Sequence, residues 1–181
     1  SRLICTLLYL HFFFTVLFSF FFFFFYCYGD HRVLHSFPTR RSSDLDFLNI
    51  QAGPFSFKAK FEHVRAPKTC ARFIELLPFK NKVIHSRWSG EAVWIPLGDF
   101  DAEVDFENHT CHPSRGDILL YPGGYSETEI LFAYGSSSFA SKMGALAGNH
   151  VLTVVEGQDQ LLEFGNHVLW QGAQDIHFYA D

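Results

Sequence analysis

Short segments with the pattern of β-strands fill most of the chain after residue 46, and only two stretches have helical periodicity. The clearest segment, Phe55–Glu62, alternates apolar and polar residues with a period of two, as a half-buried antiparallel strand does. We expect strands over residues 47–51, 55–62, 82–88, 92–97, 118–121, 128–134, 151–155 and 175–179, and loops over 98–115 and 135–148. Because no strand–helix–strand rhythm connects them, the pattern predicts a mainly β fold: a closed antiparallel barrel of about eight strands with two helices.

The two helical stretches cover residues 66–77 and 158–169. Pro67 suits the first turn of a helix, where its missing N–H has no partner to lose, and Pro78 ends the first helix. Its apolar stripe follows the spacing i, i+3, i+4 and i+7 through Cys70, Phe73, Ile74 and Leu77. In the second helix the apolar set is Leu161, Leu162 and Val168. We expect both helices to turn these sets toward the barrel.

An apolar run from Leu3 to Tyr28, including six consecutive phenylalanines, precedes this domain. It is long enough to span a bilayer, and a signal peptide is the other standard interpretation. However, only Arg2 provides a positive charge before it, no small-residue cleavage site follows it, and the stretch VLHSFPTRRSSDL (residues 33–45) matches the translation of a sequencing-library adapter. We therefore expect residues 1–45 to be adapter contamination plus a translated homopolymer, with no membrane anchor, and residues 46–181 to form one domain.

The charge of this domain disfavours a nucleic-acid surface, and we expect no nucleic-acid partner. Four of the 14 Lys and Arg residues and two of the 19 Asp and Glu residues precede Asp46, which leaves 10 basic and 17 acidic residues without a basic cluster. Phosphate contacts need clustered Lys and Arg, so we expect a small-molecule ligand instead, and leave a homo-oligomer open. Two cysteines remain, Cys70 and Cys111, which do not make a disulfide framework and predict reduced thiols and a cytoplasmic protein.

Three polar groups are candidates for binding or catalysis at the ends of expected strands. Arg87, Trp88 and Glu91 surround a tight Ser-Gly turn. A guanidinium binds carboxylates or amide oxygens and an indole offers a stacking face, although the same residues could form a surface ion pair across a hairpin. Glu127 and Glu129 occupy alternate positions, so their carboxylates could raise each other's pKa for acid–base work, or hold a divalent cation. The alternatives are a solvated strand face or ion pairs with Arg87 and Lys142.

The third group is Asn149 and His150, which enter a strand from a glycine-rich loop. His150 is a candidate general base, and the alternative is that it only caps the loop. Tyr121, before Pro-Gly-Gly, is expected either to line a pocket mouth or to pack. His109, Cys111 and His112 do not have a standard zinc spacing, and no phosphate loop or dinucleotide fingerprint is present, so we predict neither a metal nor a cofactor.

Three blocks of this sequence resemble cyclophilins: residues 66–73 (APKTCARF), His85-Ser86-Arg87, and residues 149–159 (NHVLTVVEGQD). The chain is more closely similar, from about Ile50 to Phe178, to a small bacterial family of cyclophilin-like proteins with no assigned function. That similarity lies in residues 87–94, 116–124, 126–130 and 146–150. The resemblance implies a cyclophilin-like barrel. It also implies that Arg87 could take the place of the cyclophilin arginine that stabilises a twisted X–Pro bond, but residues 136–139 match the cyclophilin Gly-Ser-Gln-Phe-Phe strand only in outline.

Three functions are compatible with these observations. The first is binding or processing of a small molecule, by fold analogy a ring amide, in a polar pocket at one barrel end. Arg87, Glu127, Glu129 and His150 would be catalytic, and Trp88, Glu91, Tyr121 and Asn149 would bind the ligand. The second is a peptidyl-prolyl cis-trans isomerase that uses Arg87. The third is a partner-binding module without catalysis, so whether the protein is an enzyme stays open.

Overall fold

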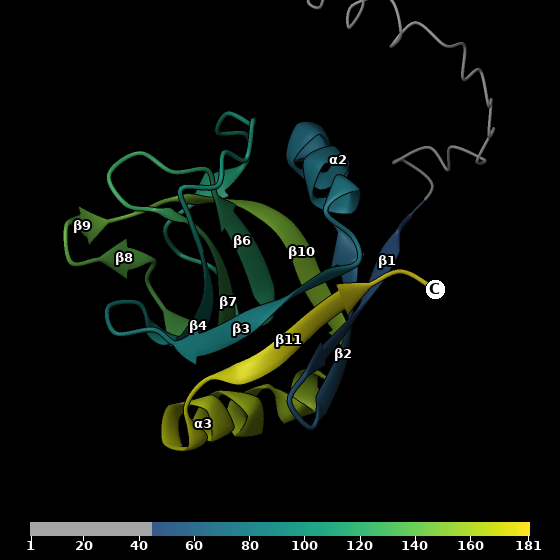
Figure 1. Ribbon diagram of the computed structural model, residues 1–181, viewed down its shortest axis with the longest axis vertical. Coiled ribbons are helices and arrows are strands. Elements are labelled where there is room, and N and C mark those ends of the chain that lie inside the picture. The colour runs from purple at the N-terminus through teal and green to yellow at the C-terminus, as the bar shows by residue number, and fades with distance from the viewer. Residues whose placement is uncertain (1–44) are drawn as a thin grey trace, which may run out of the picture. The chain divides into compact units, whose positions relative to one another are not determined.

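Eight antiparallel strands close into a barrel in the computed structural model, which describes residues 45–181 (Figure 1). The expectation for residues 1–45 lies outside these residues, apart from Leu45. The strands run in the order β2-β1-β11-β3-β4-β7-β6-β10, and β10 pairs with β2 to close the ring. Their bounds are β1 Phe47–Ala52, β2 Phe55–Phe61, β3 Phe79–His85, β4 Gly90–Gly98, β6 Asp117–Tyr121, β7 Thr128–Ser137, β10 Gly148–Glu156 and β11 Gln174–Tyr179. The predicted mainly β fold, a closed antiparallel barrel of about eight strands with two helices, is confirmed.

The interior of the barrel is filled by alternate side chains of every strand. In β2 the burial alternates as expected, with Phe55, Phe57, Ala59 and Phe61 buried. Phe57 makes edge contacts with Phe132 of β7 and with Phe164, at ring-centroid distances of 5.7 and 5.4 Å. Such edge-to-face arrangements are the ones that aromatic quadrupoles favour. One continuous apolar core therefore joins the strands to the helix that carries Phe164.

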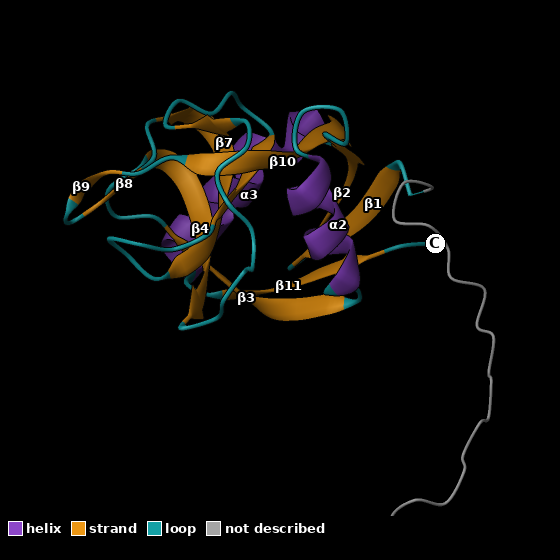
Figure 2. Cartoon of the chain, turned by 90° about the horizontal axis from the view of Figure 1, so that it is seen from above, coloured by secondary structure: helices purple, strands orange, loops and turns teal. Residues whose placement is uncertain are grey.

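A helix covers each end of the barrel (Figures 1 and 2). Helix α2 (Pro67–Glu75) begins at the predicted proline and buries Cys70 and Phe73. Helix α3 (Leu161–Gln171) follows a short 3₁₀ turn, η2 (Gln158–Gln160). The apolar set predicted for the second helix is wrong at Leu162, which is 49% exposed. Leu161 and Val168 are buried as predicted, and Phe164, three residues after Leu161, faces the core with them. No helix among the described residues is long and apolar enough to cross a membrane.

Two expected boundaries differ from the structure. The strand predicted over 82–88 is β3, which already begins at Phe79 and ends at His85, so that residues 86–89 form a turn. Its register is set by β11, since Phe79 pairs with Phe178 and Val83 with Gln174. The two predicted loops also contain short strands: β5 (His109–Thr110) pairs with β10, and β8 (Ala140–Ser141) pairs with β9 (Gly144–Ala145) in a hairpin that projects from the barrel (Figure 2).

Candidate functional site

A pocket with a volume of about 360 Å³ lies on the outer face of β4 and β7. Its floor is made by side chains that alternate with the core residues of these strands. Trp94 pairs with Leu131, and both point away from the barrel interior, whereas their neighbours Val93 and Ile130 belong to the main core. The volume falls within the range of pockets that bind small molecules. The pocket expected at one barrel end is thus found on the barrel wall.

A second apolar cluster explains why a pocket forms on this outer face. The segment after β7 folds back over the sheet and buries Phe139 and Leu146 against Leu119, Tyr121 and Leu131. This segment forms a wall of the pocket beside the floor residues Trp94 and Leu131, and the β8–β9 hairpin is part of that wall. Ala140, Ser141 and Lys142 of that wall line the pocket.

The turn between β3 and β4 adjoins this wall and carries Arg87 and Trp88. Ser89 N donates to Ser86 Oγ at 3.1 Å, and Ser89 Oγ donates to the Ala140 carbonyl at 3.0 Å. Gly90 adopts a φ of +77°, and a Cβ there would meet the Ser136 carbonyl at 2.8 Å. Only glycine adopts this conformation without strain. The local sequence Ser-Arg-Trp-Ser-Gly therefore ties the turn to β8 and leaves its two large side chains at the pocket.

The other end of the pocket is acidic. Glu129 opens the outward row of β7 and is 6% exposed, whereas Glu127 lies in the preceding loop and is exposed. Burial, together with the charge of Glu127, raises the pKa of Glu129 from 4.5 to about 7. Within residues 45–181 neither carboxylate takes part in a hydrogen bond or an ion pair. Such a buried carboxyl group, half ionised near neutral pH, is suited to proton transfer.

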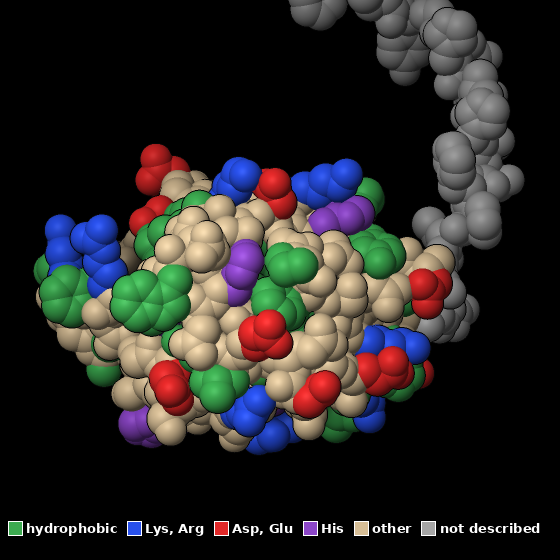
Figure 3. All heavy atoms as spheres, turned by 90° about the horizontal axis from the view of Figure 1, so that it is seen from below, with side chains coloured by type: hydrophobic (Ala, Val, Ile, Leu, Met, Phe, Trp, Pro, Cys, Tyr) green, Lys and Arg blue, Asp and Glu red, His purple; other side chains and the backbone are tan. Residues whose placement is uncertain are grey.

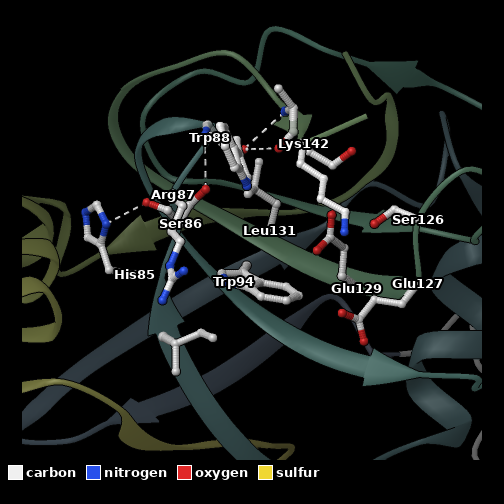
Figure 4. Close-up of a pocket in the computed structure, with 14 residues that line it drawn as sticks. His85, Ser86, Arg87, Trp88, Trp94, Ser126, Glu127, Glu129, Leu131 and Lys142 are labelled. Atoms are coloured by element: carbon white, nitrogen blue, oxygen red, sulfur yellow. Dashed lines mark hydrogen bonds between the residues drawn. The ribbon is translucent and has the colours of Figure 1, made fainter. Parts of the chain in front are cut away.

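Two cations and two indoles complete the lining. Arg87 and Lys142 both reach the pocket, and in the described part of the chain neither side chain has a charged or hydrogen-bonded partner. Figure 4 shows Arg87 on one side of the Trp94 ring and Glu127 and Glu129 on the other, with the Lys142 side chain extending toward the acidic end. Trp88, which is 60% exposed, stands at the rim.

Two of the predicted ligand-binding residues support the site from outside its lining. Glu91 Oε2 accepts a hydrogen bond from Ser136 N at 2.7 Å, which fixes the end of β7. Tyr121 is 2% exposed, and its hydroxyl accepts a hydrogen bond from Tyr125 N at 3.1 Å. That bond anchors the loop that carries Ser126 and Glu127. Tyr121 therefore packs, the second of its two expected roles.

Asn149 and His150 lie on β10, which β6 separates from β7, so the structure does not bring them to the pocket. Asn149 is fully buried, and its amide is bonded to Thr69 Oγ1, the Asp105 carbonyl and Glu107 N. His150 Nε2 lies 3.3 Å from Asp117 Oδ1. Burial by itself lowers the pKa of His150, but the hydrogen bond and the charge of Asp117 raise it above its ordinary value.

Several lining residues were not predicted from the sequence: His85, Trp94, Ser126 and Lys142. Trp94 could have been found, because the alternation of β4 places it on the face opposite to Val93 and Ile95. His85 has both ring nitrogens occupied: Nδ1 donates to the Ser86 carbonyl at 2.7 Å, and Nε2 accepts from the Tyr134 hydroxyl at 2.8 Å. The sequence indicated Lys142 only as an ion-pair partner of the two glutamates, since its position at the pocket depends on how residues 138–147 fold over the sheet.

Within residues 45–181 no three histidine, cysteine, aspartate or glutamate side chains are grouped so that they could hold a metal ion. His109, Cys111 and His112 therefore do not form such a group either. Cys70 and Cys111 are both free thiols. Burial raises the pKa of the Cys70 thiol to about 12, so it is not a nucleophile at neutral pH.

The fold is similar to that of several solved structures. McbB, in a structure described as its complex with tryptophan, matches with a TM-score of 0.59 at 17% identity; the match covers 74% of this chain and 44% of McbB. A hypothetical protein from Archaeoglobus fulgidus matches with a TM-score of 0.51 at 13% identity, over 75% of this chain and 94% of that one. A cyclophilin-type peptidyl-prolyl cis-trans isomerase from Cryptosporidium parvum gives 0.46 at 13% identity, over 75% and 98%. At these identities the likeness concerns the fold alone.

Sequence comparison gives one family. A profile described as a protein of unknown function, DUF3830, matches residues 48–180, which is most of the chain. No curated protein matches the sequence.

Proposed function

The chain belongs to the DUF3830 family of unknown function, and from that premise we propose that it binds a small polar molecule in the pocket outside β4 and β7 and acts on it by proton transfer. The observation that carries the proposal is Glu129. It is a nearly buried carboxyl group without a partner among residues 45–181, its pKa is about 7, and it faces a cavity large enough for a small molecule.

In this proposal Glu129 accepts or donates the proton, and Glu127 keeps the pKa of Glu129 high. Arg87 binds a carboxylate or amide oxygen of the substrate, for which a guanidinium provides a fork of donors. Trp88 and Trp94 hold the flat part of the ligand. A ring amide meets these requirements, since it offers an oxygen to Arg87 and an exchangeable proton to Glu129.

Two observations support a small molecule over the alternatives. McbB has a similar fold and is described in complex with tryptophan, a small amino acid ligand. The prolyl isomerase alternative would be favoured by a shallow apolar groove beside Arg87, whereas the lining here includes Glu127, Glu129 and Lys142. A binding module without catalysis would not need a carboxyl group of raised pKa. We retain a cytoplasmic location in the proposal, since both cysteines are free thiols.

A thermal-shift screen of metabolites tests the proposal. The protein is compared with its Glu129→Gln variant and with Glu163→Gln, a matched control at an exposed position on α3. A ligand present at a hundred times its dissociation constant stabilises the folded state by about 2.7 kcal/mol, which raises the unfolding temperature by several degrees. We expect such a shift to shrink in Glu129→Gln and to persist in Glu163→Gln. Shifts that are equal in all three proteins, or a screen without any shift, would contradict the proposal.

A prolyl-isomerisation assay on the protein and on Arg87→Ala decides between the first two functions. We expect no turnover above the uncatalysed rate. Turnover that disappears with Arg87 would establish an isomerase and overturn the small-molecule proposal.

A further inference from the structure

The pocket has a cationic end and an acidic end, and an apolar floor separates them. On β7 the outward side chains follow in the order Glu129, Leu131, and each lies opposite a residue of β4: Glu129 opposite Pro96 and Leu131 opposite Trp94. Successive outward positions on a strand are about 7 Å apart. Arg87 enters from the turn before β4, beyond the Trp94–Leu131 pair, as Figure 4 shows.

Lys142 has to be included in the charge of the acidic end. It comes from the β8–β9 hairpin and extends toward Glu129 in Figure 4, but it makes no ion pair with either carboxylate. The acidic end therefore combines two carboxyl groups with one ammonium group that is not bound to them. A cation on a ligand can approach Glu127 and Glu129 without breaking an existing ion pair.

Exposed apolar side chains occur at, or next in the sequence to, three of the lining residues. Trp88 is 60% exposed, Met143 68% and Tyr125 85%. Trp88 lines the pocket, and the other two adjoin the lining residues Lys142 and Ser126. In Figure 3 large hydrophobic side chains gather beside basic ones at the β8–β9 end of the molecule. A ligand with an apolar middle could pack against Trp88, Trp94 and Leu131, which line the pocket between its charged ends.

From this arrangement we propose that the ligand is an aminocarboxylate whose two charges sit at opposite ends of a flat or apolar spacer. Its carboxylate binds Arg87, its spacer lies on Trp94 under Trp88, and its ammonium group binds Glu127 and Glu129. This inference rests on the proposed function and specifies the class of its substrate: an aminocarboxylate takes the place of the ring amide, which has no ammonium group for the acidic end. An α-amino acid does not fit, because its two charged groups share one carbon and cannot reach both ends of the pocket.

Calorimetric titration with a matched set of probes tests the inference. The probe is 4-(aminomethyl)benzoate, which has an ammonium group and a carboxylate on opposite sides of a ring. Benzylamine and benzoate each lack one charge, and phenylalanine carries both on one carbon. Loss of one hydrogen-bonded charge reduces affinity by about ten- to a hundredfold. We therefore expect 4-(aminomethyl)benzoate to bind at least about tenfold more tightly than the other three compounds.

Variants assign the two ends. We expect Arg87→Ala to bring the affinity for 4-(aminomethyl)benzoate down to that of benzylamine, and to leave the affinity for benzylamine unchanged. The double variant Glu127→Gln, Glu129→Gln should bind 4-(aminomethyl)benzoate only as tightly as the unmodified protein binds benzoate. Arg65→Ala and Glu163→Gln are controls at exposed positions that do not line the pocket. A single cooperative unfolding transition in each variant and in each control establishes that folded proteins are being compared.

Proton release provides a second readout. At pH 7 Glu129 is half protonated, because its pKa is about 7. An ammonium group that binds there stabilises the ionised form, so titration in two buffers of different ionisation enthalpy should show the release of roughly half a proton. The other charged or titratable side chains of the lining are Glu127, Lys142, Arg87 and His85. The release should disappear in Glu129→Gln, and a release that persists there would assign the proton to another group and overturn the placement of the amine.

Glycylglycine, whose spacer is a peptide plane, distinguishes the source of the ligand. Tighter binding of glycylglycine than of 4-(aminomethyl)benzoate assigns the site to short peptides, and weaker binding assigns it to ring compounds. The inference is overturned if phenylalanine, benzoate or benzylamine binds as tightly as 4-(aminomethyl)benzoate. It is also overturned if none of the compounds binds. A metabolite that binds through Glu129 but carries a single charge would also overturn it, and would leave the proposed function intact. A metabolite screen without any shift would overturn both.

Discussion

Replacement of Glu129 by glutamine should make the protein more stable at pH 8 and should have less effect at pH 4.5. The side chain is 6% exposed, and burial with the nearby Glu127 charge raises its pKa to about 7. Between pH 4.5 and 7 the unfolded chain loses the proton of this carboxyl group while the folded protein keeps it. The folded state therefore binds more protons, and its stability falls as the pH rises through this window.

The magnitude follows from the same two values. A rise in the pKa from its ordinary 4.5 to about 7 corresponds to about 3 kcal/mol of stability, present below pH 4.5 and lost by about pH 8. This is a large part of the 5–15 kcal/mol that typically stabilises a domain. Glutamine has no charge at either pH, so the Glu129→Gln variant lacks this loss.

Urea unfolding of both proteins at pH 4.5, 6 and 8 measures the effect. The difference in unfolding free energy between Glu129→Gln and the unmodified protein should shift in favour of the variant by about 2–3 kcal/mol from pH 4.5 to pH 8. Any direct effect of the amide is the same at all three values and cancels in this comparison. The control Glu163→Gln should show no such shift. A difference that stays constant with pH would refute the raised pKa, and with it the proton-transfer role proposed for this residue.

Three further predictions concern other parts of the molecule. Asn149→Ala should lower the unfolding free energy by about 2–3 kcal/mol in urea titrations and leave probe binding at the pocket unchanged, since it leaves several buried polar groups unpaired away from the pocket. Gly165→Ala should destabilise the protein by roughly 1–3 kcal/mol, because the added Cβ would meet the Tyr134 ring at 2.4 Å; an unchanged melting temperature would contradict the packing of α3. An NMR titration should give His150 a pKa above its ordinary value of 6.5. The stability that its pairing with Asp117 contributes is therefore fully present below pH 6.5 and is lost as the pH rises through the pKa of the folded state. Asp117→Asn should lower the pKa of His150 in the same titration.

The alternation of apolar and polar residues was sufficient to predict the barrel. In β2 each residue of Phe55–Phe61 has the burial that its position in the pattern predicts. The start of α2 was also readable, because Pro67 is compatible only with the first turn and the stripe from Cys70 onward has one helical phase. These features are local, since they depend on the geometry of neighbouring residues.

Features that depend on distant partners were predicted less well. The bounds of β3 follow from its pairing with β11, which lies almost a hundred residues away in the sequence. The local pattern was compatible with more than one start and end for this strand, and pairing with β11 selected one.

The fold class was predictable from the sequence, and so were Arg87, Trp88, Glu127 and Glu129, because charged and aromatic residues beside a Ser-Gly turn or at alternate positions are visible in one dimension. The structure was needed to show that these four line one pocket, that Trp94 and Lys142 belong with them, and that Asn149 and His150 do not. The pocket exists because residues 138–147 bury Phe139 and Leu146 against the outer face of the sheet. Which side chains then meet is set by strand order and register, which join residues far apart in the sequence.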